Sequence, residues 1–190
     1  MKTLAIINQK GGVGKTCLSF HLAWYFAELG RRTLIVDLDP QGNLSSLFDG
    51  EGCLTGSIFT QGLTPQPLLV ERPTPRGVNL KFGLISADES LQALEATTNG
   101  LAGLTKLRKA LRTLEAQWDI VIIDCPPSLG GFSANAIVAA DHVVIPCTVR
   151  QFAINGLEHV CEVVTTTREE GLNPSVDILA VVLNQFNRDS

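Results

Sequence analysis

Two lysines, Lys10 and Lys15, flank a glycine cluster close to the start of the chain, in the stretch KGGVGKT at residues 10–16. The stretch follows the apolar residues 4–7 and precedes a segment with apolar side chains at helical spacing. A strand, a glycine-rich loop and a helix in this order wrap backbone N–H groups around phosphate groups. Glycine suits such a loop because a Cβ atom would meet the phosphate oxygens. Residues 10–16 therefore predict a phosphate-binding loop.

Within this loop, Lys15 and Thr16 have side chains suited to phosphate and metal chemistry. We expect Lys15 to reach the β and γ phosphates of a nucleotide, and the Thr16 hydroxyl to be a ligand of Mg²⁺. The ordinary loop pattern has glycine where this chain has Gln9, so the match is to a variant whose loop opens with Lys10. A simple turn of glycine and lysine is the alternative, and the flanking strand and helix count against it. The expected nucleotide-binding residues of the loop are Lys10, Gly11, Gly12, Val13, Gly14, Lys15, Thr16 and Cys17.

Three aspartates follow predicted buried strands, at the strand ends where parallel sheets bind ligands. Asp37 and Asp39 follow the apolar residues 33–36, and Asp124 ends the apolar run at residues 120–124. We expect these carboxylates to surround one Mg²⁺, with Asp124 holding it through a water. Asp39 is expected either to contribute to the metal site or to orient or deprotonate the attacking water. Asp37 could support either role, and a helix cap or turn is an equally good interpretation of this residue.

Apolar runs typical of strands alternate with segments of helical periodicity along the whole chain. The predicted strands are residues 3–8, 33–36, 79–85, 120–124, 142–146 and 178–183, and the predicted helices are residues 16–29, 89–96, 101–116, 133–140 and 154–169. Residues 41–77 are rich in Gly, Pro, Ser and Thr, and they are expected to form short helical turns and loops. Strands that are apolar on both faces and separated by helices predict an α/β fold, with a doubly wound, mostly parallel sheet and helices on both faces.

Composition excludes several classes of protein. The five cysteines have no Cys-x-x-Cys spacing, which predicts small buried thiols in a reducing compartment and argues against a redox pair. No apolar run approaches the ~18 residues of a membrane span, and no secretory signal is present at the start. We therefore expect a cytoplasmic protein.

Charge bears on whether the chain binds nucleic acid. The formal net charge is −4 and there is no basic tail, so DNA binding would need a local patch, several copies of the chain, or residues beyond Ser190. A basic cluster within the predicted helix 101–116 could meet DNA phosphates, although a solvated helix face is the favoured interpretation. The cluster consists of Lys106, Arg108, Lys109 and Arg112.

Three motifs, in the order NQKGGVGKT, VDLDPQGN and VIIDCPPSLG, resemble those of the ParA/Soj branch of the ParA and MinD superfamily of deviant Walker ATPases. The similarity runs from residue 2 to about residue 188. It implies a P-loop NTPase fold and an ATPase that uses Mg²⁺ and dimerises around two ATP molecules. Lys10 then matches the signature lysine that crosses to the partner's phosphates, while Lys15 serves its own nucleotide.

The resemblance also assigns roles to four other residues. Asp39 matches the carboxylate needed for hydrolysis, Thr16 the Mg²⁺ ligand, and Asp124 the Walker B acid. Asn184 is placed like an asparagine that contacts adenine in relatives. Family members normally continue with another strand, a proline-containing loop and C-terminal helices. We therefore expect residues 1–190 to be a single P-loop ATPase domain that lacks the family's C-terminal elements.

The resemblance further implies a function in plasmid or chromosome partition or in cargo positioning. ATP-bound homodimers would bind nucleoid DNA nonspecifically, and a ParB-like partner would stimulate hydrolysis. The alternative is a membrane-associated positioning ATPase like MinD, which would need a C-terminal amphipathic helix, whereas residues 187–190 read Asn-Arg-Asp-Ser. An iron-sulfur carrier would need paired exposed cysteines. A GTPase would need Asn-Lys-x-Asp, whereas residues 184–187 read Asn-Gln-Phe-Asn.

Overall fold

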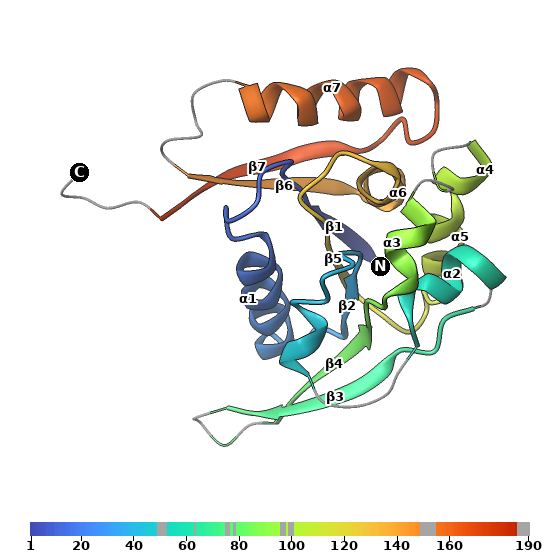
Figure 1. The fold of residues 1–190 in the computed structure, drawn as a ribbon. Helices are drawn as coiled ribbons and strands as arrows, with labels where there is room; N and C mark the ends of the chain where they lie inside the picture. Colours follow the sequence, from blue (N-terminus) through green and yellow to red (C-terminus); the bar gives the residue numbers. More distant parts are fainter. Residues whose placement is uncertain are drawn as a thin grey trace.

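The computed structural model of this chain describes residues 1–48, 53–62, 64–74, 77, 79–95, 98, 101–148 and 155–185. Within these residues, seven strands form one sheet in the order β3-β4-β2-β5-β1-β6-β7 (Figure 1). The strands are β1 Lys2–Ile6, β2 Thr33–Asp37, β3 Leu68–Pro73, β4 Asn79–Ile85, β5 Ile120–Asp124, β6 His142–Thr148 and β7 Asp177–Asn184. Neighbouring strands are parallel except for β3, which runs antiparallel to β4. The predicted α/β fold with a mostly parallel sheet is confirmed.

Helices cover both faces of this sheet (Figure 1). They are α1 Lys15–Glu28, α2 Thr55–Gln61, α3 Ser90–Leu94, α4 Leu101–Leu104, α5 Lys106–Arg112, α6 Gly131–Ala139 and α7 Asn155–Glu169, together with the 3₁₀ helix η1 Ser45–Leu47. On the α1 face, Ile35 and Ile122 pack with Ala23 in one buried cluster. On the other face, Val121 packs with Phe132 of α6 in a second cluster. Two cores explain why the central strands are apolar on both faces.

Two predicted segments differ from the structure. Residues 41–77 contain η1 and α2, which fit the expected short helical turns, but they also contain the strand β3. β3 is an edge strand in which only Val70 is buried, so it tolerates Glu71 and Arg72 and lacks the continuous apolar pattern of the central strands. The predicted helix 101–116 is divided into α4 and α5 and ends at Arg112. Thr105 lies at this break and Gly103 lies within α4, and both are weak helix formers.

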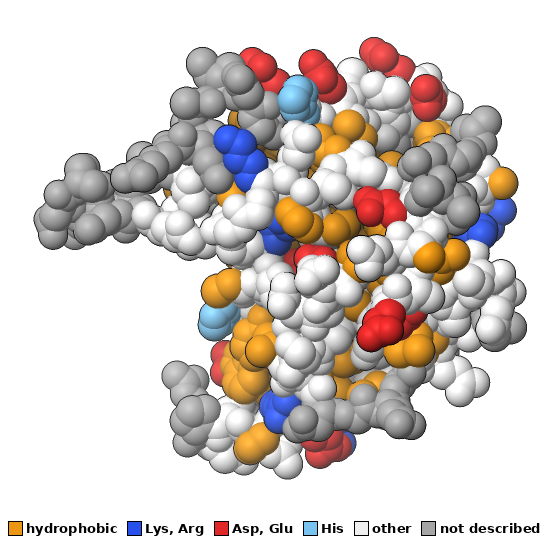
Figure 2. Space-filling model, in the orientation of Figure 1, with side chains coloured by type: hydrophobic (Ala, Val, Ile, Leu, Met, Phe, Trp, Pro, Cys, Tyr) orange, Lys and Arg blue, Asp and Glu red, His pale blue; other side chains and the backbone are white. Residues whose placement is uncertain are grey.

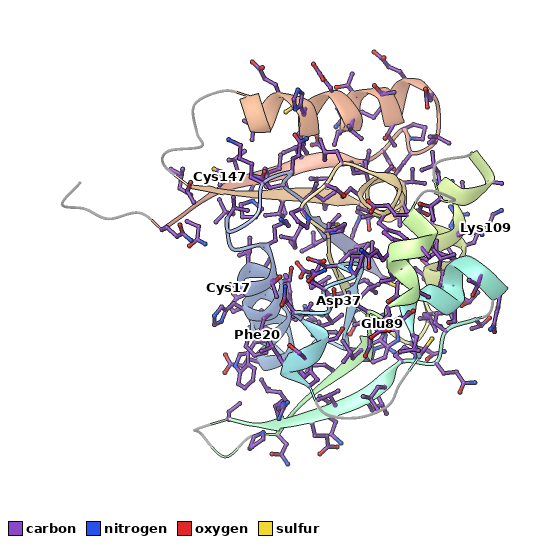
Figure 3. All side chains as sticks on the ribbon, in the orientation of Figure 1. Cys17, Phe20, Asp37, Glu89, Lys109 and Cys147 are labelled. Atoms are coloured by element: carbon purple, nitrogen blue, oxygen red, sulfur yellow. The ribbon has the colours of Figure 1, made fainter. Side chains whose placement is uncertain are left out.

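The cysteines are less uniform than predicted. Cys125 and Cys147 are buried, but Cys17 is exposed, and Cys53 and Cys161 are intermediate. All five thiols are free. The prediction of buried thiols was therefore wrong for Cys17, because the N-terminal turn of α1 turns this side chain away from the sheet (Figure 3).

The described residues give no support to the alternative of a membrane-associated ATPase. No helix among the described residues is both long and apolar enough to cross a bilayer. Residues 187–190, which bear on the amphipathic-helix alternative, lie outside the described residues, as does residue 154 at the start of the last predicted helix.

Candidate phosphate-binding site

The loop between β1 and α1 has the geometry of a backbone cradle. Gly12 and Gly14 have φ angles of 74° and 91°, a left-handed conformation that glycine adopts most readily. A Cβ atom on Gly11 or Gly12 would meet nothing within 4 Å, so there is open space beside the loop. Gly14 precedes the first residue of α1, where free N–H groups and the helix dipole favour an anion. The loop therefore has both the space and the donors that a phosphate group needs.

Lys15 is held inside this loop. Its side chain is buried, with the residue 7% exposed, and its Nζ donates to the backbone carbonyl of Lys10 at 3.0 Å. Burial lowers the pKa of Lys15, since the ammonium loses solvation, while the nearby Asp124 opposes this effect. The ammonium is thus placed at the loop, where a phosphate group could replace the carbonyl as its partner.

Asp124 lies at the centre of a small buried network. Thr16 Oγ1 donates to Oδ2 of Asp124 at 2.8 Å, and Ser19 Oγ donates to Oδ1 at 2.7 Å. Asp124 is fully buried, and this desolvation raises its pKa to about 7 despite the two hydroxyl donors. Ser19 was missed from the sequence, although its position three residues after Thr16 puts both hydroxyls on one helix face.

This donor set fits Mg²⁺. A carboxylate and a hydroxyl are the hard oxygen ligands that Mg²⁺ prefers, and a cation would stabilise the charged form of the buried carboxyl group. In the part of the chain that the structure describes, no group of three or more His, Cys, Asp or Glu side chains could hold a metal ion. The expected enclosure of one Mg²⁺ by Asp37, Asp39 and Asp124 is therefore not formed by these side chains alone. Mg²⁺ commonly takes only one or two carboxylates and completes its shell with water and phosphate oxygens.

Asp37 in β2 pairs with Asp124 in the register of β5, and its hydrogen bonds favour the turn interpretation. Its Oδ1 accepts from the N–H of Asp39 at 3.0 Å. Its Oδ2 accepts from the N–H of Ser45 at 2.9 Å and from Ser45 Oγ at 2.7 Å. Burial raises the pKa of Asp37. Asp37 therefore fixes the loop that carries Asp39.

Asp39 is only 7% exposed, and one of its oxygens is engaged. Its Oδ1 accepts from the N–H of Gln41 at 3.0 Å. Its Oδ2 has no hydrogen-bond partner among the described residues. Asp39 thus combines a turn-forming contact with one oxygen available for a water molecule.

Lys10 is exposed, and no described residue forms an ion pair or hydrogen bond with its ammonium group. Only its backbone is fixed: its N–H donates to Oδ1 of Asn8 at 2.9 Å. Asn8 is buried and its Nδ2 donates to the carbonyl of Pro146 in β6 at 2.8 Å. The sequence did not reveal this role of Asn8. Asn8 thus attaches the loop to β6 through its side chain, while the Lys10 side chain has no hydrogen bond to any described residue.

Asn184, predicted to contact adenine, lies against the loop. Its Nδ2 donates to the carbonyl of Val13 at 3.0 Å, and its Oδ1 accepts from the N–H of Gln185 at 2.9 Å. A Cβ atom on Gly14 would lie 2.1 Å from this Nδ2. Both polar ends of the amide are therefore bonded to the backbone in this structure.

The basic cluster on α5 lies away from the phosphate loop. Lys106 donates to the carbonyl of Phe59 and Arg108 donates to that of Leu172, so two of the four cations hold backbone groups. Figure 3 shows Lys109 on the outer side of α5, far from Asp37 at the centre of the molecule. These contacts agree with the favoured interpretation of an ordinary helix face.

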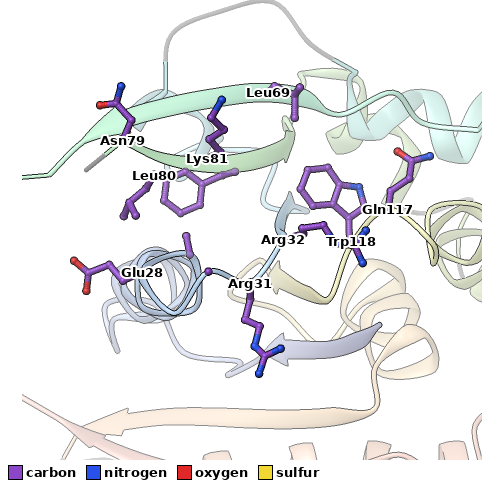
Figure 4. Close-up of a pocket in the computed structure, with 12 residues that line it drawn as sticks. Glu28, Arg31, Arg32, Leu69, Asn79, Leu80, Lys81, Gln117 and Trp118 are labelled. Atoms are coloured by element: carbon purple, nitrogen blue, oxygen red, sulfur yellow. The ribbon is translucent and has the colours of Figure 1, made fainter. Parts of the chain in front are cut away.

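A cavity of about 620 Å³ lies at the opposite edge of the sheet, where β2, β4 and β5 begin (Figure 4). The indole of Trp118 forms part of its wall. Two of its cations are already paired, since Arg32 lies 2.7 Å from Asp119 and Lys81 lies 2.7 Å from Glu71. The residues that line the cavity do not include the loop at residues 10–16, so it is separate from the predicted phosphate site.

Comparison with known proteins gives consistent matches. A family model described as an AAA domain matches residues 1–178. The chain is 38% identical to a chromosome partitioning protein ParA of Myxococcus xanthus, over 98% of this chain and 65% of that protein. It is 36% identical to a chromosome-partitioning ATPase Soj of Thermus thermophilus, over 98% of this chain and 70% of that protein.

The solved structures of cobyrinic acid a,c-diamide synthase from Mycobacterium smegmatis are also similar. The structure with bound ADP and magnesium has a TM-score of 0.85 and 30% identity, and the match covers 100% of this chain and 77% of that one. The structure of the same protein with a bound ATP analog and magnesium gives the same values.

Proposed function

Because the chain belongs to the ParA/Soj family of P-loop ATPases, we propose that it is an ATP-driven switch for the partition of DNA or the positioning of a cargo. The observation that carries the proposal is the contact of Thr16 with the buried Asp124 beside Lys15, which supports a site for a nucleotide with Mg²⁺. Structural neighbours that hold ADP or an ATP analog with magnesium lend further support. We treat residues 1–190 as a single P-loop ATPase domain.

The proposed binding roles follow from the loop geometry. The backbone N–H groups of residues 11–17 surround the phosphates, and Lys15 neutralises the β and γ phosphates. Thr16 and Asp124 would hold Mg²⁺, with the Thr16 hydroxyl as a ligand and the Asp124 carboxylate as its partner, and Asp39 is the further candidate near the metal. When bound, Mg²⁺ neutralises charge that develops on the phosphate oxygens. The resemblance assigns Asn184 to adenine, but its Nδ2 donates to the carbonyl of Val13 in the loop, which favours a role in positioning the loop.

Hydrolysis is proposed to depend on Asp39. Its available oxygen can orient the attacking water or accept its proton, while its other oxygen stays bonded to Gln41. Asp37 contributes by fixing the turn that contains Asp39. Positioning of this kind is the main contribution that a protein makes to phosphoryl transfer.

Dimerisation is proposed to depend on Lys10. Its ammonium is exposed and has no hydrogen bond or ion pair with any residue that the structure describes, so it can reach the phosphates bound by a second copy of the chain. In the cytoplasm, the ATP-bound dimer would bind nucleoid DNA nonspecifically. A ParB-like partner would stimulate ATP hydrolysis and release of the protein from DNA. The outer face of α7 is unsuited to DNA, because it carries the exposed residues Glu158, Glu162 and Glu169, and Figure 2 shows acidic side chains along the top of the molecule, where α7 lies. DNA contacts would therefore come from other faces of the dimer.

The experiment that tests this function measures DNA binding with ATP, with ADP and without nucleotide, at two salt concentrations. We expect binding with ATP only, little preference for sequence, and a steep loss of affinity as salt rises, since phosphate contacts release counterions. Anionic liposomes serve as the competing surface. ATP-dependent binding to liposomes with none to DNA would favour the membrane-positioning alternative instead.

A further inference from the structure

Two amide side chains at the end of β7 bond to the phosphate loop. Asn184 Nδ2 donates to the carbonyl of Val13 at 3.0 Å, and Gln185 Nε2 donates to the carbonyl of Gly12 at 3.0 Å. The partners lie 171 and 173 positions apart in the sequence. We refer to Asn184 and Gln185 as the amide clamp. It holds two successive carbonyls in the middle of the predicted phosphate cradle.

The clamp has a stereochemical consequence for the N–H groups of the loop. In a planar trans peptide, the carbonyl and the N–H of the next residue point in opposite directions. Donors that hold the carbonyls of Gly12 and Val13 therefore turn the N–H groups of Val13 and Gly14 away from the clamp. These N–H groups belong to the loop whose donors must converge on an anion. The clamp is thus placed to orient phosphate-binding donors without touching the phosphate itself.

The backbone around the clamp has an unfavourable conformation. Gln185 has a φ angle of 56°, and it is the only residue other than glycine with a positive φ among the described residues. Such a conformation is costly for a residue with a Cβ atom, and it persists where surrounding contacts fix it. Here, the N–H of Gln185 bonds to Oδ1 of Asn184 at 2.9 Å, and the two side chains bond to the loop.

Gly14 fits closely against the clamp. Its φ is 91°, and a Cβ atom there would lie 2.1 Å from Nδ2 of Asn184. The absence of a side chain at Gly14 therefore allows the amide of Asn184 to reach the carbonyl of Val13. Glycine at this position serves the clamp as well as the turn into α1.

We propose that Asn184 and Gln185 are positioning residues that orient the N–H groups of the phosphate loop and so determine its affinity for polyphosphate. The inference rests on the proposed nucleotide site, but it differs from the adenine contact that the resemblance implies for Asn184. In this structure both polar atoms of the Asn184 amide bond to backbone, and the bond from Nδ2 is to the phosphate loop itself. The clamp acts on the phosphate part of the ligand, so its loss should affect ligands with and without a base alike.

Calorimetric titrations with Mg²⁺ and ATP, GTP or inorganic tripolyphosphate test this proposal. We expect Gln185→Met and Asn184→Ala each to raise the Kd by about threefold to tenfold, as for one lost hydrogen bond. Within each variant, the factor should be the same for ATP and for tripolyphosphate. The ratio of ATP affinity to GTP affinity should not change. Gln92→Met makes the same substitution on the exposed face of α3, and it should leave all three affinities unchanged.

A second variant separates positioning from folding. Gln185→Gly removes the side-chain donor but also relieves the left-handed backbone, so its melting temperature should not fall while its Kd for tripolyphosphate rises. Unchanged affinities in both Gln185 variants would overturn the proposal. So would an Asn184→Ala protein with weaker ATP binding, a lower ATP preference over GTP, and unchanged tripolyphosphate binding. A wild-type protein that binds neither ATP nor tripolyphosphate would remove the proposed function, and the inference with it.

Discussion

The hydroxyl of Thr16 donates a hydrogen bond of 2.8 Å to Oδ2 of Asp124, although the two residues are 108 positions apart in the sequence. Thr16 lies in the first turn of α1, and Asp124 ends β5, which pairs with both β1 and β2 at the centre of the sheet. The contact therefore exists only when the central sheet is folded. It joins the phosphate loop directly to the strand that carries the predicted metal-binding carboxylate.

Ser19 supplies the second hydrogen-bond donor to the Asp124 carboxylate, so its removal should lower the stability of the folded protein. Ser19→Ala should lower the free energy of unfolding by about 1–2 kcal/mol, because the buried Oδ1 of Asp124 loses its 2.7 Å donor. Urea unfolding measures this change. Ser46→Ala removes an exposed hydroxyl that bonds to the carbonyl of Asn43, and should change stability by less than about 0.5 kcal/mol. Equal losses in the two variants would argue against a buried network at Asp124.

Gly14 and Gly62 form a matched pair for testing the loop. Both have a positive φ, but a Cβ atom on Gly62 would meet nothing within 4 Å, whereas one on Gly14 would meet Asn184. Each change to alanine should lower the free energy of unfolding by about 1–2 kcal/mol through backbone strain, and Gly14→Ala should lose more because its Cβ would displace the Asn184 amide. Only Gly14→Ala should also reduce nucleotide affinity, which calorimetry can measure. Normal nucleotide binding by a folded Gly14→Ala protein would contradict the described loop geometry.

Alanine variants of Lys10 and Lys15 should separate ATP-dependent dimerisation from nucleotide binding. Lys10→Ala should retain nucleotide binding, because its exposed ammonium has no hydrogen bond or ion pair with any described residue of its own chain, yet it should lose ATP-dependent dimers. Lys15→Ala should lose most nucleotide affinity, because it removes the buried cation from the loop. Light scattering with ATP and with ADP measures dimerisation. ATP-dependent dimers of the Lys10 variant equal to those of the wild type would rule out the cross-subunit role.

The ion pair of Arg32 and Asp119, at the opposite edge of the sheet, should give a defined pH dependence. Hydrogen bonds from Arg32 lower the pKa of Asp119 to about 2. Because this folded-state value lies below the ordinary carboxyl value, the pair stabilises the protein above about pH 4, and the effect is lost as pH falls towards about 2. Asp119→Asn should therefore lower the melting temperature near neutral pH, with a difference that shrinks in acid. If the difference in melting temperature between the two proteins stayed constant from pH 7 into the acid range, the charge of Asp119 would not be the source of the stabilisation. Nucleotide affinity should be unchanged.

Local signals in the sequence were sufficient to predict the loop and the central strands. The glycine spacing at residues 10–16 specifies backbone conformation directly, and residues 120–124 are apolar on both faces, as a buried parallel strand requires. The rule that parallel strands present ligands at their carboxyl ends also placed Asp124 correctly beside Thr16. These predictions depend on short stretches of chain or on a general rule of topology.

Contacts between distant segments were not predictable in the same way. Ser19, Asn8 and Gln185 act through partners 105, 138 and 173 positions away, and no local pattern identifies such a partner. The strand β3 was missed because an edge strand needs only one buried face. For Asp37, sequence could not decide between a cap and a catalytic neighbour, because both require an aspartate after a strand. Its three bonds to residues 39 and 45 favour the first interpretation.

Asp39 provides the most direct test of the proposed ATPase. Asp39→Asn keeps an Oδ1 that can accept from the N–H of Gln41, so the turn is preserved while the carboxylate is lost. The variant should bind Mg²⁺-ATP and dimerise like the wild type, while steady-state hydrolysis falls by about 100-fold or more. Hydrolysis, ATP-dependent dimerisation and melting temperature should be measured on the same preparation. A well-folded Asp39→Asn protein that hydrolyses ATP at the wild-type rate would contradict the account.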